Sequence, residues 1–202
     1  STNVAKIVYS RASQNHKRAL CLGGAKNHLL VLPDANKDMT ASNVVASMAG
    51  CAGQRCMAAS VMVAVGDTDH IVDAVVLEAK KVIVGDNLGA VISKESKERI
   101  EAYIEQAESQ GAKILLDGRG AKVAGKENGF YVGPTVIDNV TSDMTIAKEE
   151  VFGPVVAIIR SETIEEAVAI QNSSNYGNGA SVFTQSAQLN VCKIESQSIQ
   201  NY

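Results

Sequence analysis

The segment from Gly53 to Met57, Gly-Gln-Arg-Cys-Met, places a thiol beside a guanidinium directly after a run of small residues. Glycines at positions 50 and 53 allow a sharp bend and a close approach of the backbone, so Cys56 is expected on an exposed turn. Successive backbone N–H groups on that turn, with Arg55 alongside, would favour the thiolate, which is the nucleophilic form of cysteine. The alternative is that Cys56 is a small, buried and inert hydrophobe.

Arg55 also has two interpretations. Its planar guanidinium matches a carboxylate bidentately, so it is a candidate substrate-binding residue. Most arginines are solvated surface residues, which is the alternative. The other cysteines are weaker candidates: Cys51 is expected to pack at the end of a helix, and Cys192 is expected to be structural.

A second unusual segment, Lys-Glu-Glu-Val-Phe-Gly-Pro-Val, spans residues 148–155. Two adjacent carboxylates are followed by an aromatic residue and a Gly-Pro turn. A solvated acidic turn is one interpretation. The other is that Glu150 holds a polyol such as ribose while Phe152 packs on a flat ligand.

These candidates must be positioned by strands and helices that alternate along the chain. Alternation of this kind is typical of an α/β domain with a largely parallel sheet flanked by helices. We predict helices over 3–13, 38–50, 69–82, 94–112 and 163–174, and strands over 18–24, 28–35, 60–66, 112–118, 130–140, 154–160 and 179–184.

The composition narrows the class of protein. The 202 residues, 46% apolar and 20% charged, suffice for one large domain or two small ones. A net charge of −3 gives no footprint for nucleic acid or for an anionic membrane. No apolar run reaches the ~18 residues that a membrane span needs. Four cysteines without a C-x-x-C spacing indicate neither a metal site nor a disulfide framework, so we expect a reducing, intracellular compartment.

Five motifs occur in the order found in one family: Leu-Cys-Leu-Gly-Gly (20–24), Gly-Gln-Arg-Cys (53–56), Gly-Phe-Tyr-Val-Gly-Pro-Thr-Val (129–136), Glu-Glu-Val-Phe-Gly-Pro-Val (149–155) and Asn-Tyr-Gly-Asn-Gly-Ala-Ser-Val-Phe-Thr (175–184). On these motifs the chain resembles the aldehyde dehydrogenase superfamily over nearly its whole length. Residues 24–36, 49–58 and 176–184 are similar to its CoA-acylating branch, the methylmalonate-semialdehyde dehydrogenases.

The resemblance implies an aldehyde dehydrogenase catalytic domain with Cys56 as the nucleophile. It implies NAD as cofactor, with Glu150 on the nicotinamide ribose, Phe152 near the nicotinamide, and Ser1 in the cofactor motif that precedes the domain. Coenzyme A would be the acyl acceptor, and (methyl)malonate semialdehyde the small-molecule substrate. Arg55 would hold the substrate carboxylate before it leaves as carbon dioxide, and the Cys56 N–H would contribute to the oxyanion hole.

The motif at residues 20–24 departs from the family pattern. Cys21 stands where hydrolytic members carry a glutamate that acts as general base for water. Without that carboxylate, water has no proton acceptor at the site, whereas coenzyme A is already a strong nucleophile as its thiolate. The resemblance therefore implies transfer to coenzyme A. Cys21 itself could be a simple substitution or a second thiol near the site, but packing within a strand is the favoured interpretation.

The first residues, Ser-Thr-Asn-Val-Ala, are similar to the end of the family's Gly-Ser-x-x-x-Gly cofactor motif. We therefore expect residues 1–22 to be the C-terminal remnant of an NAD-binding domain. Residues 23–202 are expected to be a catalytic domain, truncated near the start of the oligomerisation segment. A chain of this extent is predicted to be inactive alone. The parent is expected to be a homo-oligomer in the mitochondrial matrix of a eukaryote or in the cytoplasm of a bacterium.

Three alternatives remain open. The chain could be a pseudoenzyme or fragment that acts only as a subunit-interaction module. It could belong to another aldehyde dehydrogenase that acts on a different aldehyde. It could also be a cysteine hydrolase in which His28 or His16 serves as base for Cys56, which requires a histidine within hydrogen-bond reach of the thiol.

Overall fold

The computed structural model describes residues 1–187, whose centre is one six-stranded sheet. The strand order is β3-β4-β5-β2-β1-β6, and every neighbouring pair is parallel except the antiparallel β3–β4 pair. The predicted α/β class with a largely parallel sheet is therefore confirmed. The strands are β1 (His28–Val31), β2 (Val61–Val65), β3 (Lys113–Leu116), β4 (Thr135–Asp138), β5 (Val155–Ser161) and β6 (Ala180–Phe183).

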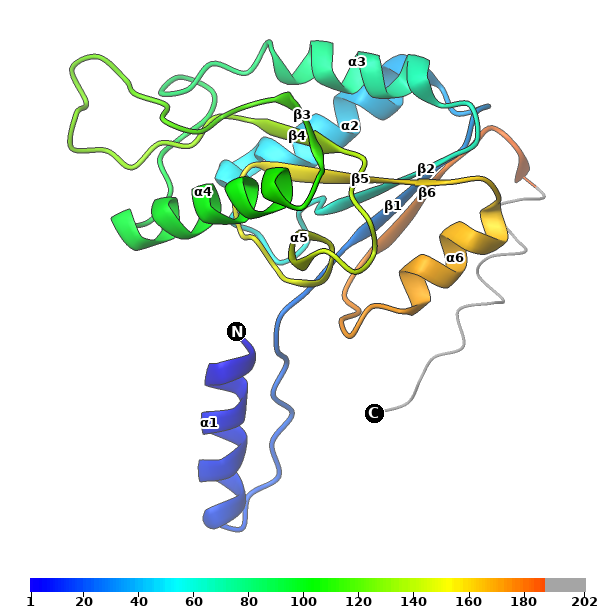
Figure 1. Ribbon diagram of the computed structural model, residues 1–202. Coiled ribbons are helices and arrows are strands. Elements are labelled where there is room, and N and C mark those ends of the chain that lie inside the picture. The colour runs from blue at the N-terminus through cyan, green and yellow to red at the C-terminus, as the bar shows by residue number, and fades with distance from the viewer. Residues whose placement is uncertain (188–202) are drawn as a thin grey trace.

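Helices lie on both faces of the sheet: Figure 1 shows α2 and α3 over one face, and α4, α5 and α6 over the other. Sequence patterns predicted all of the long helices, but neither the short α5 nor the 3-10 turn η1 that precedes the thiol. The helices are α1 (Thr2–Gln14), α2 (Lys37–Ala49), α3 (Asp69–Ala79), α4 (Lys94–Ser109), α5 (Thr145–Lys148) and α6 (Ile164–Asn172), with η1 at Gly50–Gly53.

Local sequence explains where three of these helices begin. The side chains of Asn36, Ser93 and Thr163 each accept a hydrogen bond from a backbone N–H in the first turn of α2, α4 and α6. Such N-caps satisfy a donor that the helix itself leaves unpaired.

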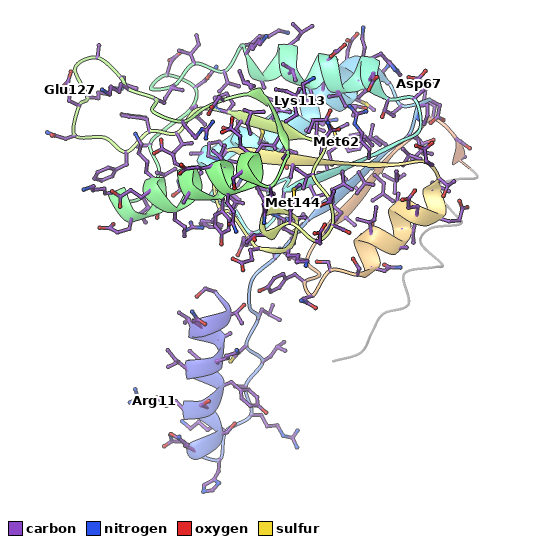
Figure 2. All side chains as sticks on the ribbon, in the orientation of Figure 1. Arg11, Met62, Asp67, Lys113, Glu127 and Met144 are labelled. Atoms are coloured by element: carbon purple, nitrogen blue, oxygen red, sulfur yellow. The ribbon has the colours of Figure 1, made fainter. Side chains whose placement is uncertain are left out.

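The core lies between the sheet and the two helical layers. β2 is buried at all five positions and β5 at six of seven, which explains why both read as continuous apolar runs. Met62, in the middle of β2, is fully buried (Figure 2). Together with the parallel register this core fixes where each strand begins, and the residues just before the strands are positioned accordingly.

The first 24 residues differ from the rest, since none of them is buried. Figure 1 shows α1 and the extended segment after it standing away from the sheet, and α1 has no buried residue. The predicted strand over 18–24 is wrong, because this extended segment pairs with no strand of the described chain. Its Leu20 and Leu22 side chains project into solvent, at 88% and 79% exposure. The division of the chain at residue 22 stays a prediction.

Among residues 1–187, no helix has the length and apolar character needed to cross a bilayer.

Candidate active site

The candidate residues converge at one edge of the sheet, where the parallel strands begin. His28 of β1 is in register with Val61 of β2 and with Ala180 of β6, and Val61 is in register with Ala157 of β5. The segments just before these strands, which carry Asn27, Cys56, Asn178 and the loop 149–153, therefore meet at the amino edge. Asp67, beyond the carboxyl end of β2, lies at the opposite end of the sheet (Figure 2).

Cys56 lies exposed on the turn before β2, as predicted from the surrounding glycines. Its carbonyl oxygen accepts two amide hydrogen bonds, from Asn27 Nδ2 at 2.7 Å and from Asn178 Nδ2 at 2.9 Å. Its own backbone N–H has no hydrogen-bond acceptor within the described residues. These two bonds fix the peptide that follows Cys56, and the Cys56 backbone N–H is available to an oxyanion.

The turn that leads to Cys56 is left-handed. Cys51, Ala52 and Gly53 have φ values of 52°, 53° and 69° in succession, and each non-glycine residue in this region costs roughly 1–2 kcal/mol. The expectation that Cys51 packs at a helix end is wrong, because the left-handed turn leaves Cys51 exposed while Ala52 and Gly53 are buried.

Gly53 joins this turn to the loop before β5. A Cβ built on Gly53 would lie 2.0 Å from the Gly153 carbonyl oxygen and 2.8 Å from Pro154 N. Only a residue without a side chain allows this approach. The turn that carries the thiol is thus in direct backbone contact with the Glu-Glu-Val-Phe-Gly-Pro loop.

Arg55 folds back onto the end of α2. Its Nη2 donates to the carbonyl oxygens of Ala46 and Ser47, each at 3.1 Å, which satisfies acceptors at the helix C-terminus. Within the described chain, Nε and Nη1 have no acceptor. Arg55 is exposed, so these donors remain accessible to a carboxylate.

The loop 149–153 is held by three side chains from other elements. Lys26 Nζ donates to the Glu149 carbonyl oxygen at 2.7 Å, Arg99 Nη1 donates to the Val151 carbonyl oxygen at 2.7 Å, and the Tyr103 hydroxyl donates to the Glu149 carboxylate. Burial raises the pKa of Tyr103 to about 12, and this bond to Glu149 adds to the shift, so Tyr103 remains a donor at neutral pH.

Glu150 and Phe152 project from this loop differently. A Cβ on Gly24 would lie 3.3 Å from a Glu150 carboxylate oxygen and 3.2 Å from the Tyr176 ring, so Glu150 lies against the Gly24 backbone. Phe152 has a φ of 55° and is 38% exposed. An exposed aromatic in a left-handed conformation indicates a side chain held toward solvent, where a ligand can meet it.

Ser1 is the N-cap of α1 and is exposed. The next residue, Thr2, accepts a hydrogen bond from Gly24 N through its hydroxyl at 3.2 Å. The positive end of the α1 dipole therefore lies next to Gly24, the glycine beside Glu150.

The histidine alternative gains no support from the geometry. Burial lowers the pKa of His28 to about 4, and its Nδ1 pairs with the Lys26 carbonyl oxygen at 3.0 Å. His16 lies beyond the far end of α1. Within residues 1–187 neither histidine is hydrogen-bonded to Cys56.

The remaining cysteines are Cys21 and Cys192. Cys21 is half-buried on the extended segment 15–27 and, since that segment forms no strand, the expected strand packing is wrong. Cys192 and the expected oligomerisation segment lie outside the described residues.

Lys26 gives a pH prediction, because it is 2% exposed. Desolvation lowers its pKa from 10.5 to about 7, against the opposing attraction of Glu150 and Glu149. Between pH 7 and 10.5 the unfolded chain therefore binds more protons at this residue than the folded chain, so the unfolding free energy should rise with pH across that window. Urea unfolding at several pH values should show this rise in the natural chain and not in Lys26→Met. Parallel pH curves for the two proteins would contradict it.

Four residues at this edge were not predicted as site residues from the sequence: Lys26, Asn27, Tyr176 and Asn178. The only local signal was the Lys-Asn pair placed directly before an apolar strand, where polar side chains need partners. Those partners lie about 30 and 120 positions away along the chain and cannot be read from local sequence.

No group of three or more His, Cys, Asp or Glu in the part of the chain that the structure describes could hold a metal ion.

The fold and site together define a class: an α/β domain with an exposed cysteine at the amino edge of a largely parallel sheet, beside a loop carrying a carboxylate and an aromatic side chain. Residues 1–195 match the model of the aldehyde dehydrogenase family. The chain belongs to the aldehyde dehydrogenase family.

Relatives of this chain carry the branch name that its motifs suggested. It is 45% identical over 190 residues to the mitochondrial methylmalonate-semialdehyde/malonate-semialdehyde dehydrogenase [acylating] of Rattus norvegicus, covering 91% of this chain and 36% of the relative. It is 39% identical over 196 residues to malonate-semialdehyde dehydrogenase of Pseudomonas aeruginosa, covering 93% and 39%. The chain thus spans less than half the length of these relatives.

Solved structures agree. The crystal structure of methylmalonate-semialdehyde dehydrogenase from Oceanimonas doudoroffii matches with a TM-score of 0.92 and 42% identity, covering 99% of this chain and 42% of that one. A structure from Sinorhizobium meliloti 1021 complexed with NAD matches with a TM-score of 0.93 and 39% identity, covering 96% and 41%.

Proposed function

We propose that this chain is the cysteine-bearing domain of an NAD-dependent, CoA-acylating aldehyde dehydrogenase that acts on malonate or methylmalonate semialdehyde. The observation that carries the proposal is the exposed Cys56, whose backbone N–H has no acceptor among residues 1–187 and whose turn contacts the loop of Glu150 and Phe152 through Gly53. The bracketed word "acylating" in the names of several relatives supports the acyl-transfer chemistry.

The residues at the amino edge fit a dinucleotide. The N-terminus of α1, with Ser1 at its cap, is suited to a phosphate because its free N–H groups and dipole favour anions. Glu150 would accept hydrogen bonds from ribose hydroxyls, and the exposed Phe152 would pack beside a flat ring. NAD, when bound, supplies the acceptor for the hydride that leaves the substrate carbon.

Cys56 is proposed to carry the substrate through the reaction. Its thiolate adds to the aldehyde carbon, forming a C–S bond, and the resulting oxyanion is held by the Cys56 N–H. Loss of hydride from that carbon leaves a thioester on Cys56.

Arg55 would hold the substrate carboxylate through Nε and Nη1. That carboxylate then leaves as carbon dioxide: its bonding electrons pass into the thioester enolate, and a solvent proton completes the acetyl or propionyl group. The coenzyme A thiolate attacks the thioester carbon, and Cys56 leaves as a thiolate, ready for the next aldehyde.

The preference for coenzyme A over water is proposed from the absence of a base. The sequence has no Asp or Glu before Asp34, so neither Cys21 nor any neighbour on the segment 15–27 supplies a carboxylate to deprotonate water. This argument holds whichever residue of that segment faces the thiol.

A chimaeric enzyme tests the proposal: a complete relative in which the corresponding segment is replaced by residues 1–202. With malonate semialdehyde and NAD, steady NADH formation is expected only when coenzyme A is present. Without coenzyme A we expect a burst of about one NADH per site, since the thioester then has no acceptor. Equal steady turnover with and without coenzyme A would rule out acyl transfer.

The assembly and location of the parent remain proposals as well. A homo-oligomeric parent is proposed, in the mitochondrial matrix if eukaryotic and in the bacterial cytoplasm otherwise. The word "mitochondrial" in the names of the eukaryotic relatives supports the first location.

A further inference from the structure

Two adjacent polar side chains, Lys26 and Asn27, stand directly before β1 and are almost completely buried, at 2% and 6% exposure. In an extended chain successive side chains point to opposite sides. Lys26 reaches the Glu149 carbonyl oxygen at 2.7 Å. Asn27 reaches the carbonyl oxygens of Cys56 at 2.7 Å and Ala58 at 2.8 Å. One dipeptide thus holds both the loop 149–153 and the turn that carries the thiol.

Stability alone does not explain the lysine. Burying an ammonium group is costly, and one carbonyl acceptor compensates it poorly. An apolar side chain of similar volume would fill the position at lower cost. What Lys26 adds is direction, because its hydrogen bond fixes the backbone of Glu149.

Only the nitrogen of the Asn27 side-chain amide is hydrogen-bonded within the described residues. Both of its donated bonds go to carbonyl oxygens, which sets the orientation of its amide. Its Oδ1 is buried and has no hydrogen-bond partner within the described residues. Asn27 lines a cavity of about 90 Å³ together with Met57 and Gly179. The amide therefore leaves its acceptor unsatisfied while its donors hold the Cys56 peptide.

Asn178, from the segment before β6, donates to the same Cys56 oxygen at 2.9 Å. Two donors, from the segments before β1 and β6, restrict rotation about the Cα–C bond of Cys56. This bond sets the direction of the Cys56 side chain and N–H relative to the peptide that follows.

We propose that Lys26 and Asn27 are positioning residues, which together set the separation of the nucleophile turn (53–58) and the cofactor loop (149–153). The inference rests on the proposed function for its significance to catalysis. Because the two side chains hydrogen-bond to different segments, the proposal predicts a different effect for the removal of each one. Removal of Lys26 should loosen the cofactor loop alone, and removal of Asn27 should loosen the nucleophile turn alone.

Hydrogen exchange of the 202-residue chain, followed by mass spectrometry of peptides, tests this asymmetry. In Lys26→Met, amides of 149–153 should exchange at least tenfold faster and those of 54–60 should change less than twofold. In Asn27→Ala the pattern should reverse. Faster exchange across the whole sheet, or the same pattern in both variants, would overturn the proposal, since a merely structural role predicts a global effect.

A second readout follows the thiol itself. The rate of Cys56 alkylation by iodoacetamide, measured on its peptide, should change at least fivefold in Asn27→Ala and less than twofold in Lys26→Met. An unchanged rate in Asn27→Ala would overturn the role of that residue.

Matched controls exist within the chain. Lys126 Nζ also donates to a backbone carbonyl, that of Gly85, and Asn15 Nδ2 donates to that of Arg11, both away from the site. Lys126→Met and Asn15→Ala should leave both segments and the alkylation rate unchanged. If Lys26→Met or Asn27→Ala does not fold, Lys26→Gln and Asn27→Ser, which are too short to make the same bonds, should show the same split. Neither readout uses NAD, coenzyme A or an aldehyde, so failure of the proposed function would not alter these results.

Discussion

Replacing Cys56 with alanine in the chimaeric enzyme should lower NADH formation about 10⁴-fold or more and remove the burst seen without coenzyme A. The reason is that the proposed thioester forms on the Cys56 sulfur, and loss of a covalent nucleophile typically has effects of this size. Stopped-flow absorbance of NADH measures the burst and the steady rate together.

Cys51 provides the matched control for this experiment. It is also an exposed thiol, five residues earlier on the same turn. Cys51→Ala should retain the burst and at least half of the turnover. A Cys56→Ala enzyme with a normal burst, or a Cys51→Ala enzyme without one, would show that the nucleophile has been assigned to the wrong residue.

Replacing Gly53 with alanine should be the most damaging change outside the thiol, destabilising the chain by about 2–5 kcal/mol. The new Cβ would lie 2.0 Å from the Gly153 carbonyl oxygen, and φ at this position is 69°. Both backbone segments must then move apart, which also separates Cys56 from the loop of Glu150 and Phe152. Chemical denaturation of the chain measures the first effect, and turnover of the chimaeric enzyme measures the second.

Gly120 separates the two causes of that loss. It has the same φ of 69°, but no atom within 4 Å of the place a Cβ would take. Gly120→Ala should therefore cost only the conformational part, about 1–2 kcal/mol, and leave turnover unchanged. Similar losses in Gly53→Ala and Gly120→Ala would mean that the contact with Gly153 has no energetic importance.

The long helices and the central strands were predictable because their signals are local. Asn36, Ser93 and Thr163 cap the helices that follow them, and the unbroken apolar runs at β2 and β5 indicate strands covered on both faces. The exposed position of Cys56 followed from the glycines around it. These features depend on residues within a few positions of one another.

The rest depended on long-range contacts. Nothing near Cys51 indicates a left-handed turn, because that turn is held by the approach of Gly53 to Gly153, a hundred positions away. Residues 18–24 have the apolar character of a strand, but none of the described strands pairs with them. Whether Arg55 turns to α2 or to solvent is decided by the carbonyl groups of Ala46 and Ser47. The roles proposed for Lys26 and Asn27 could not be predicted from the sequence either, because their hydrogen-bond partners are distant along the chain.

In the proposed reaction, Cys56 carries an acyl group and passes it to coenzyme A. Peptide mass spectrometry of the chimaeric enzyme, quenched in acid after incubation with malonate semialdehyde and NAD, tests it most directly. An acetyl group is predicted on the peptide containing Cys56, and it should disappear when coenzyme A is added before the quench. An acyl group on any other residue, or one on Cys56 that persists with coenzyme A, would contradict the account.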